Sequence, residues 1–194
     1  MLTLLASLAL LSTAAPAPAG QNPLACRTMN TANLPLATRK SPLDSLSFKV
    51  GATQVKLCYG RPSARGRTMI GGDAVPFGKL WRTGANEPTM IHTAGPITIA
   101  GVAVPAGSYS IYTIPGQTEW QVIVNRSISQ WGHESQYTEQ VKAQEVGHGV
   151  AKSEAASAPV ETLAFRTEPG TGGAVDLVLE WEKTRVKIPV APGK

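Results

Sequence analysis

The sequence predicts an all-β protein, an antiparallel β-sandwich of jelly-roll or immunoglobulin-like type with one short helix. Nineteen glycines and fifteen prolines are spread along the 194 residues, and they interrupt the chain too often for long helices. Short stretches of alternating apolar and polar residues follow one another between turn residues, a pattern typical of sandwiches built from many short strands.

The expected strands lie beyond residue 44. They cover Leu46–Val50, Thr53–Tyr59, Thr89–Thr93, Ile97–Val104, Ser108–Ile114, Trp120–Asn125, Val160–Thr167, Val175–Glu182 and Arg185–Val190. The alternation is clearest near the carboxyl terminus, where Trp181 falls on the apolar face while Glu180 and Glu182 fall on the face expected to meet water.

The connections between these strands follow from the turn residues. A tight turn at residues 182–184 is expected to make the last two strands a hairpin, and Pro105–Gly107 is expected to turn a second hairpin within residues 97–114. Ser153–Pro159 is expected to be a loop of small residues. The segment Glu134–Val146 is the only candidate for a helix of any length.

The chain is expected to have three parts. Residues 1–19 are uncharged and contain an apolar run followed by Ala17-Pro18-Ala19, a pattern typical of a cleaved secretory signal. Residues 20–43 are polar, interrupted by proline and without periodicity, and indicate a flexible amino-terminal arm. Residues 44–194 are expected to form one β-sandwich domain, because 42% hydrophobic residues suffice for a proper core. The protein is therefore expected to be exported, either periplasmic or secreted, without an integral membrane segment.

Two cysteines, Cys26 and Cys58, are present. In an exported protein a disulfide can persist, so pairing of the two is the favoured interpretation. Two alternatives stay open. The cysteines can be free thiols, with Cys58 buried in a strand. Alternatively, Cys26 can be a lipid-modified first residue, although Pro23 occupies a position where the lipidation motif prefers leucine.

The charge is distributed unevenly. Residues 1–82 contain ten Lys and Arg and two acidic residues, a net charge of +8, whereas residues 83–194 have a net charge of −3. Because the aromatic residues do not alternate with the basic ones as a stacking surface requires, nucleic acid is not the expected partner. A small polar or anionic ligand or a glycan is expected instead. The sequence does not predict an oligomeric state.

The positive charge is concentrated between Tyr59 and Glu87, a segment with six glycines and poor alternation, which is typical of a site rather than a strand. Arg61, Arg65 and Arg67 are candidate ligand-binding residues, since an arginine fork suits carboxylate or phosphate. A solvated basic loop is the alternative.

The turn WRTGANE supplies three more candidate ligand-binding residues: Arg82, Asn86 and Glu87. Gly84 allows a tight reversal, so we expect Arg82 to face Glu87 in one polar pocket with the other arginines. A structural ion pair that fixes the turn is the alternative.

Three functions remain open on these residues. The first is a binding module for an anionic ligand or glycan, the second a hydrolase or isomerase that uses Glu87 with Arg82 and Asn86, and the third a structural envelope protein. No catalytic residue can be assigned, and no cofactor fingerprint is present. A metal site is not expected because His92, His133 and His148 lie far apart in the sequence.

Several sequence words together resemble a known family. They are SPLDSLSF (41–48), YGRPSARGR (59–67), VPFGKLWRTGANE (75–87), VPAGSYSIYTIP (104–115), VNRSISQWG (124–132) and LVLEWEKTRVKIPV (177–190). The chain is identified by them as a member of the bacterial domain-of-unknown-function family numbered 2911. The resemblance implies an exported, sheet-rich domain and implies no activity, substrate or catalytic residue.

Overall fold

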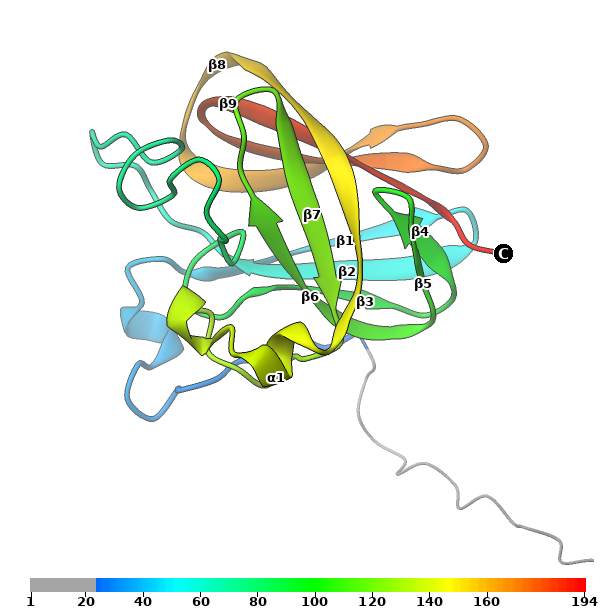
Figure 1. Ribbon diagram of the computed structural model, residues 1–194, viewed down its shortest axis with the longest axis horizontal. Helices are drawn as coiled ribbons and strands as arrows, with labels where there is room; N and C mark the ends of the chain where they lie inside the picture. The colour runs from blue at the N-terminus through cyan, green and yellow to red at the C-terminus, as the bar shows by residue number, and fades with distance from the viewer. Residues whose placement is uncertain (1–23) are drawn as a thin grey trace, which may run out of the picture.

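A computed structural model describes residues 24–194, so the expected signal at 1–19 lies outside the described residues. Nine strands form one continuous antiparallel sheet in the order β1-β2-β3-β6-β7-β8-β9-β4-β5 (Figure 1). The strands are β1 (Leu43–Val50), β2 (Thr53–Gly60), β3 (Thr89–Thr93), β4 (Ile97–Ile99), β5 (Val102–Val104), β6 (Gly107–Ile114), β7 (Glu119–Asn125), β8 (Glu145–Pro169) and β9 (Val175–Pro192). The helical elements are the 3-10 helices η1 (Leu36–Thr38) and η2 (Glu134–Gln136) and the helix α1 (Glu139–Lys142). The predicted all-β class with one short helix is confirmed.

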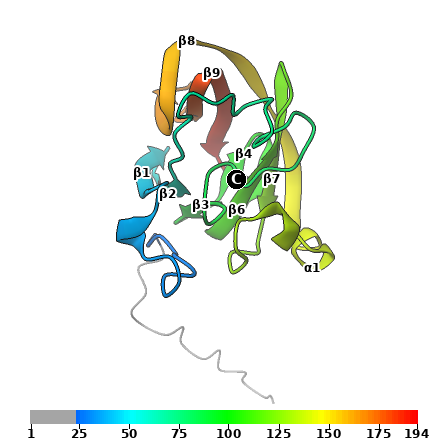
Figure 2. The same cartoon turned by 90° about the vertical axis from the view of Figure 1, so that its left-hand side faces the viewer.

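The sheet curls around one hydrophobic core. Figure 2 shows β1 and β2 on one side of this core and β7 and the first part of β8 on the other. Three tryptophans meet inside: Trp81 stacks on Trp181 with ring centroids 6.0 Å apart, and Trp120 contacts Trp81 edge-on at 6.0 Å. Trp181 is 1% exposed, so its predicted core position is confirmed.

The prediction of a hairpin that turns at residues 182–184 is wrong. Strand β9 runs without reversal from Val175 to Pro192, and it bends at Glu182, whose φ is 54°. The loop expected at Ser153–Pro159 is wrong too, because these residues belong to β8. The register of β8 against β9 shifts between Ala155 and Val160, a bulge that lets both long strands bend together.

Two further connections differ from the prediction. The helix expected within Glu134–Val146 is reduced to η2 and the four residues of α1, because β8 already begins at Glu145. The strand expected at 97–104 is divided by a reversal at Ala100 and Gly101, with φ values of 49° and 84°, which suits a tight hairpin between β4 and β5. Strand β6 pairs with β3 and β7 instead of forming a hairpin with this segment.

The amino-terminal arm, as far as it is described, contains η1 and ends at Leu43, the first residue of β1. It is attached to the sheet by the bond between Cys26 and Cys58 and by the buried side chain of Arg39. Across residues 24–194, none of the helices combines the length and the apolar character needed to span a bilayer.

Candidate functional site

The WRTGANE turn, residues 81–87, is mostly buried. Its ends are joined by a hydrogen bond from the Thr89 amide to the Arg82 carbonyl at 3.0 Å, and the Thr89 hydroxyl donates to the Thr83 carbonyl at 2.8 Å. Thr83 and Asn86 have φ values of 59° and 66°, in the left-handed region, which asparagine tolerates but a β-branched threonine seldom occupies. Such a conformation persists only where the surroundings impose it.

Glu87 does not face Arg82, so the expected pairing within the turn is wrong. Its carboxylate instead binds the Arg39 guanidinium in a bidentate pair, with N–O distances of 2.7 and 3.0 Å, and also accepts the Met29 amide at 2.6 Å. Arg39 and Glu87 are 6% and 4% exposed. The Arg39 guanidinium carbon lies 6.0 Å from the Trp131 ring centroid, within the range of a cation–π contact. Glu87 therefore fixes the arm to the body of the protein.

Arg82 and Asn86 also hold other segments. Arg82 lies 3.5 Å from a carboxylate oxygen of Glu134, at the start of η2. The Asn86 amide donates to the Ser41 carbonyl at 2.8 Å, just before β1. Each polar side chain predicted for this turn thus makes a long-range structural contact, and none of the three lines the hollows described below.

The arginine loop, which we define as residues 61–70, is fastened to the bent strands β8 and β9. One Glu161 oxygen accepts the Arg65 amide at 2.7 Å. One Glu182 oxygen accepts the amides of Met69 and Ile70 at 3.0 and 2.8 Å. Glu182 is therefore half-buried against the loop and does not simply face water as the alternation predicts. Two carboxylates set the path of the loop through its backbone.

The arginines of the loop have different surroundings. Arg61 donates to the Leu163 carbonyl at 3.2 Å and lies 3.2 Å from Asp44. Arg65 and Arg67 bond only to nearby backbone carbonyls, and across residues 24–194 neither has a carboxylate within ion-pair distance of its guanidinium. Both side chains are exposed. These two arginines keep free donors for a ligand.

The basic hollow lies beside Arg65 and Arg67. It has a volume of about 410 Å³ and is lined by Lys40, Ser41, Pro62, Ser63, Arg65 and Arg67. This lining contains three cations and no carboxylate. The Lys40 ammonium makes no hydrogen bond or ion pair within the described part of the chain, and its side chain is exposed. The hollow suits a carboxylate, phosphate or sulfate group.

The bend hollow is also bordered by Arg67 and lies where the loop meets the bend of β8 and β9. It has a volume of about 470 Å³. Its lining combines charged, hydroxyl and apolar side chains, contributed by Ala64, Arg67, Thr68, Ile70, Pro159, Val160, Glu161, Glu182, Lys183 and Thr184 together with Gly66.

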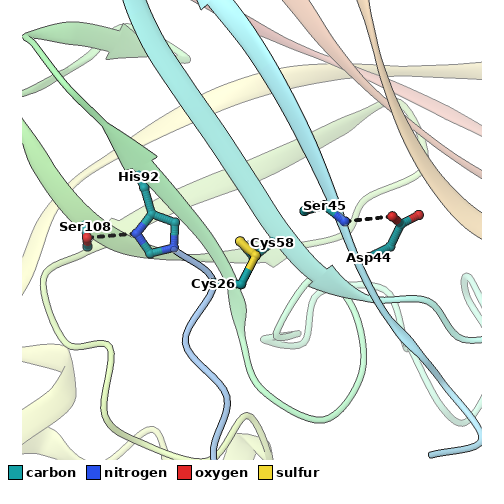
Figure 3. Close-up of a disulfide and its surroundings, with 6 residues drawn as sticks. All are labelled: Cys26, Asp44, Ser45, Cys58, His92 and Ser108. Carbon is teal, nitrogen blue, oxygen red and sulfur yellow. Dashed lines mark hydrogen bonds between the residues drawn. A yellow bond between two sulfur atoms is a disulfide. The ribbon is translucent and has the colours of Figure 1, made fainter. Parts of the chain in front are cut away.

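The predicted disulfide between Cys26 and Cys58 is confirmed, with Cα atoms 5.6 Å apart. Figure 3 shows it near His92 of β3, whose Nδ1 lies 2.8 Å from the Ser108 hydroxyl of β6. Burial, aided by the charge of Lys56, lowers the pKa of His92, so its ring is neutral at pH 7. Within residues 24–194 the structure holds no cluster of three or more His, Cys, Asp or Glu suited to a metal ion.

Replacing Cys26 and Cys58 together by alanine is expected to lower the free energy of unfolding by about 3 to 4 kcal/mol, because the bond closes a loop spanning 32 sequence positions. Urea denaturation of the variant and of the parent protein measures the difference. Reduction of the parent protein should reproduce the loss. Two alkylatable thiols in unreduced, denatured parent protein would contradict the bond itself.

Sequence reasoning missed the residues that complete both hollows. Lys40 lies in the segment expected to be a flexible arm, and Glu161 and Glu182 were expected only as strand residues. A usable signal is the strand alternation itself: Glu182 continues the polar face next to the kink, where a side chain can reach a neighbouring loop.

A family profile described as a protein of unknown function, DUF2911, matches residues 41–190. No curated protein and no solved structure shows a significant match to the chain. The matched range contains the WRTGANE turn, the arginine loop and nearly the whole sheet, and it excludes Cys26, Arg39 and Lys40 of the arm. Because the match covers well over half of the sequence, the chain belongs to this family of unknown function.

Proposed function

We propose that this protein is an exported binding module that takes up an anionic small ligand, or the anionic group of a glycan, in the basic hollow. The observation that carries the proposal is the convergence of Lys40, Arg65 and Arg67 on one hollow whose lining has no carboxylate. Like charges gathered without a counter-ion favour an anion over a neutral or cationic ligand.

The loop geometry supports this function. The Arg67 side chain donates to the carbonyls of Ala64 and Ser63 at 2.9 and 3.2 Å, and Arg65 donates to the Lys40 carbonyl at 3.2 Å. These bonds hold both guanidinium groups near the hollow before a ligand arrives. A preorganised site loses less conformational entropy on binding than a flexible one.

Export is part of the same proposal. It rests on the apolar start of the sequence with its Ala17-Pro18-Ala19 pattern and on the Cys26–Cys58 bond, because disulfides persist in oxidising compartments. A ligand of the cell envelope or the surrounding medium fits that setting.

An enzymatic role for Glu87 has less support. Both of its oxygens are bound by Arg39, and one also accepts the Met29 amide, so neither is free to exchange a proton with a substrate. A purely structural role in the envelope makes no use of the basic hollow, and the experiment below separates it from binding.

Glucuronic acid and inorganic phosphate are the probes for this proposal, with binding measured by isothermal titration calorimetry at low and at physiological salt. Lys40→Ala is expected to weaken anion binding roughly tenfold, because it removes a cation whose ammonium makes no hydrogen bond or ion pair in the described chain. Lys49→Ala is the matched control, since it removes the same charge from an exposed position on β1.

Added salt should weaken the parent complex, as expected for an exposed charged site. An equal effect of the two lysine variants, or no heat of binding with either anion, would contradict the proposed function.

A further inference from the structure

Arg67 borders three hollows, so they lie next to one another along the arginine loop. Besides the basic hollow and the bend hollow, it lines a third of about 360 Å³ with Thr68, Met69, Gly72, Asp73 and Ala74. A single inorganic anion occupies only a small part of this space. The surface is large enough for a ligand of several linked units.

The charge is not uniform along this surface. The basic hollow has three cations and no acid, whereas the bend hollow has Arg67 and Lys183 balanced by Glu161 and Glu182. A ligand with a negative charge on every unit would place one charge against these two carboxylates. The complementary ligand carries its negative charge at one end and is neutral next to it.

The bend hollow offers the contacts that a sugar ring needs. Each of its two glutamates uses one carboxylate oxygen on the loop backbone, Glu161 at the Arg65 amide and Glu182 at the amides of Met69 and Ile70, so each keeps one oxygen as a free acceptor. The hydroxyls of Thr68 and Thr184 and the Lys183 ammonium add donors to the same hollow.

Apolar side chains complete this lining. Ala64, Ile70, Pro159 and Val160 border the bend hollow together with the polar groups. A sugar ring presents hydroxyls around its edge and C–H groups on its faces, so a lining of this mixed kind can satisfy both. A purely ionic ligand would leave the apolar part unused.

We infer that the ligand is an anionic oligosaccharide, whose acidic unit lies in the basic hollow and whose neighbouring neutral sugar lies in the bend hollow, with Arg67 between them. This inference rests on the proposed function and specifies its ligand class. The loop backbone is already fixed by Glu161 and Glu182, so the two hollows keep a constant spacing for the two units.

The test compares three probes in the full mature protein by isothermal titration calorimetry. They are glucuronic acid, the neutral cellotetraose, and a hyaluronan tetrasaccharide, in which glucuronic acid alternates with a neutral amino sugar. The tetrasaccharide is expected to bind about tenfold or more tighter than glucuronic acid, because it fills both hollows. Cellotetraose is expected to bind more weakly than either acid.

Two variants address the bend hollow without changing a residue of the basic hollow. Thr68→Met fills it with an uncharged side chain at an exposed position, and Lys183→Ala removes an exposed cation that makes no ion pair within the described residues. Both are expected to weaken the tetrasaccharide about fivefold or more while leaving the affinity for glucuronic acid within about twofold. Lys40→Ala should weaken the binding of both acidic probes, whereas Lys49→Ala should weaken the binding of neither.

The results distinguish this inference from the function on which it rests. In one outcome glucuronic acid binds through Lys40, but the tetrasaccharide binds no tighter than glucuronic acid or is insensitive to both bend-hollow variants. This outcome overturns the inference of an oligosaccharide ligand and leaves the proposed anion site intact. If neither glucuronic acid nor the hyaluronan tetrasaccharide binds, the inference and the proposed function are both overturned. Equal binding of cellotetraose and the acidic tetrasaccharide also overturns the inference, since the acidic unit would then have no role.

Discussion

Glu87→Gln is expected to lower the free energy of unfolding by about 3 to 5 kcal/mol, because it removes the charge that neutralises a fully buried arginine. The Arg39 side chain is 0% exposed and would keep its charge without a carboxylate partner. Denaturant unfolding measures the effect. The matched control is Glu134→Gln at the half-exposed pair with Arg82, where the loss should stay below about 1 kcal/mol.

Combining Arg39→Met with Glu87→Leu should recover a large part of that stability, since an apolar pair of similar volume avoids burying an unpaired charge. The Glu87→Gln variant should still bind the anionic probes, because Glu87 does not line the basic hollow. Unchanged stability with lost binding would reverse the assignment and make Glu87 part of the binding site.

Trp181→Ala is expected to cost about 3 to 5 kcal/mol of unfolding free energy. The substitution leaves a cavity beside Trp81 and removes the hydrogen bond from the Trp181 indole to the Glu161 carbonyl at 3.2 Å. Because Glu161 also holds the arginine loop, anion binding should weaken together with stability.

The control for Trp181 is its neighbour on the opposite face. Glu180 has a side chain that is 17% exposed, pairs with the more exposed Arg166 and lies 3.5 Å from Arg185, so Glu180→Ala should cost about 1 kcal/mol, well below the loss for Trp181→Ala. The midpoints of guanidinium denaturation give both values. Equal midpoints for the two variants would contradict the core position of Trp181.

Local patterns predicted the fold well where turn residues bound a strand or where apolar and polar residues alternate along it. Thr89–Thr93 is found with the expected bounds, and the alternation over 175–181 places Trp181 inward. The same reasoning failed where a strand bends without ending. Small residues at 153–159 and the charged residues at 182–184 are typical of turns, but here they form a bulge and a kink within two long strands.

The candidate site was predictable only in part, because its decisive contacts join residues far apart in the sequence. Arg39 and Glu87 are separated by 48 positions, and Glu182 and the Ile70 amide by 112. Composition located the arginine loop as a basic segment. It could not indicate which arginine has a carboxylate nearby, since that depends on how the sheet curls and where the arm returns to it.

Glu161 and Glu182 fix the path of the arginine loop, whereas the exposed side chains of the loop determine which ligand it can bind. Both glutamates accept backbone amides, which every residue except proline supplies, so these anchors do not depend on which side chain stands at the exposed position 65, while Met69 and Ile70 also hold the loop through buried side chains. The exposed residues between these anchors can therefore change without loss of the frame. This makes the loop a replaceable recognition element on a fixed scaffold, in which new ligand preferences can arise by surface substitutions alone.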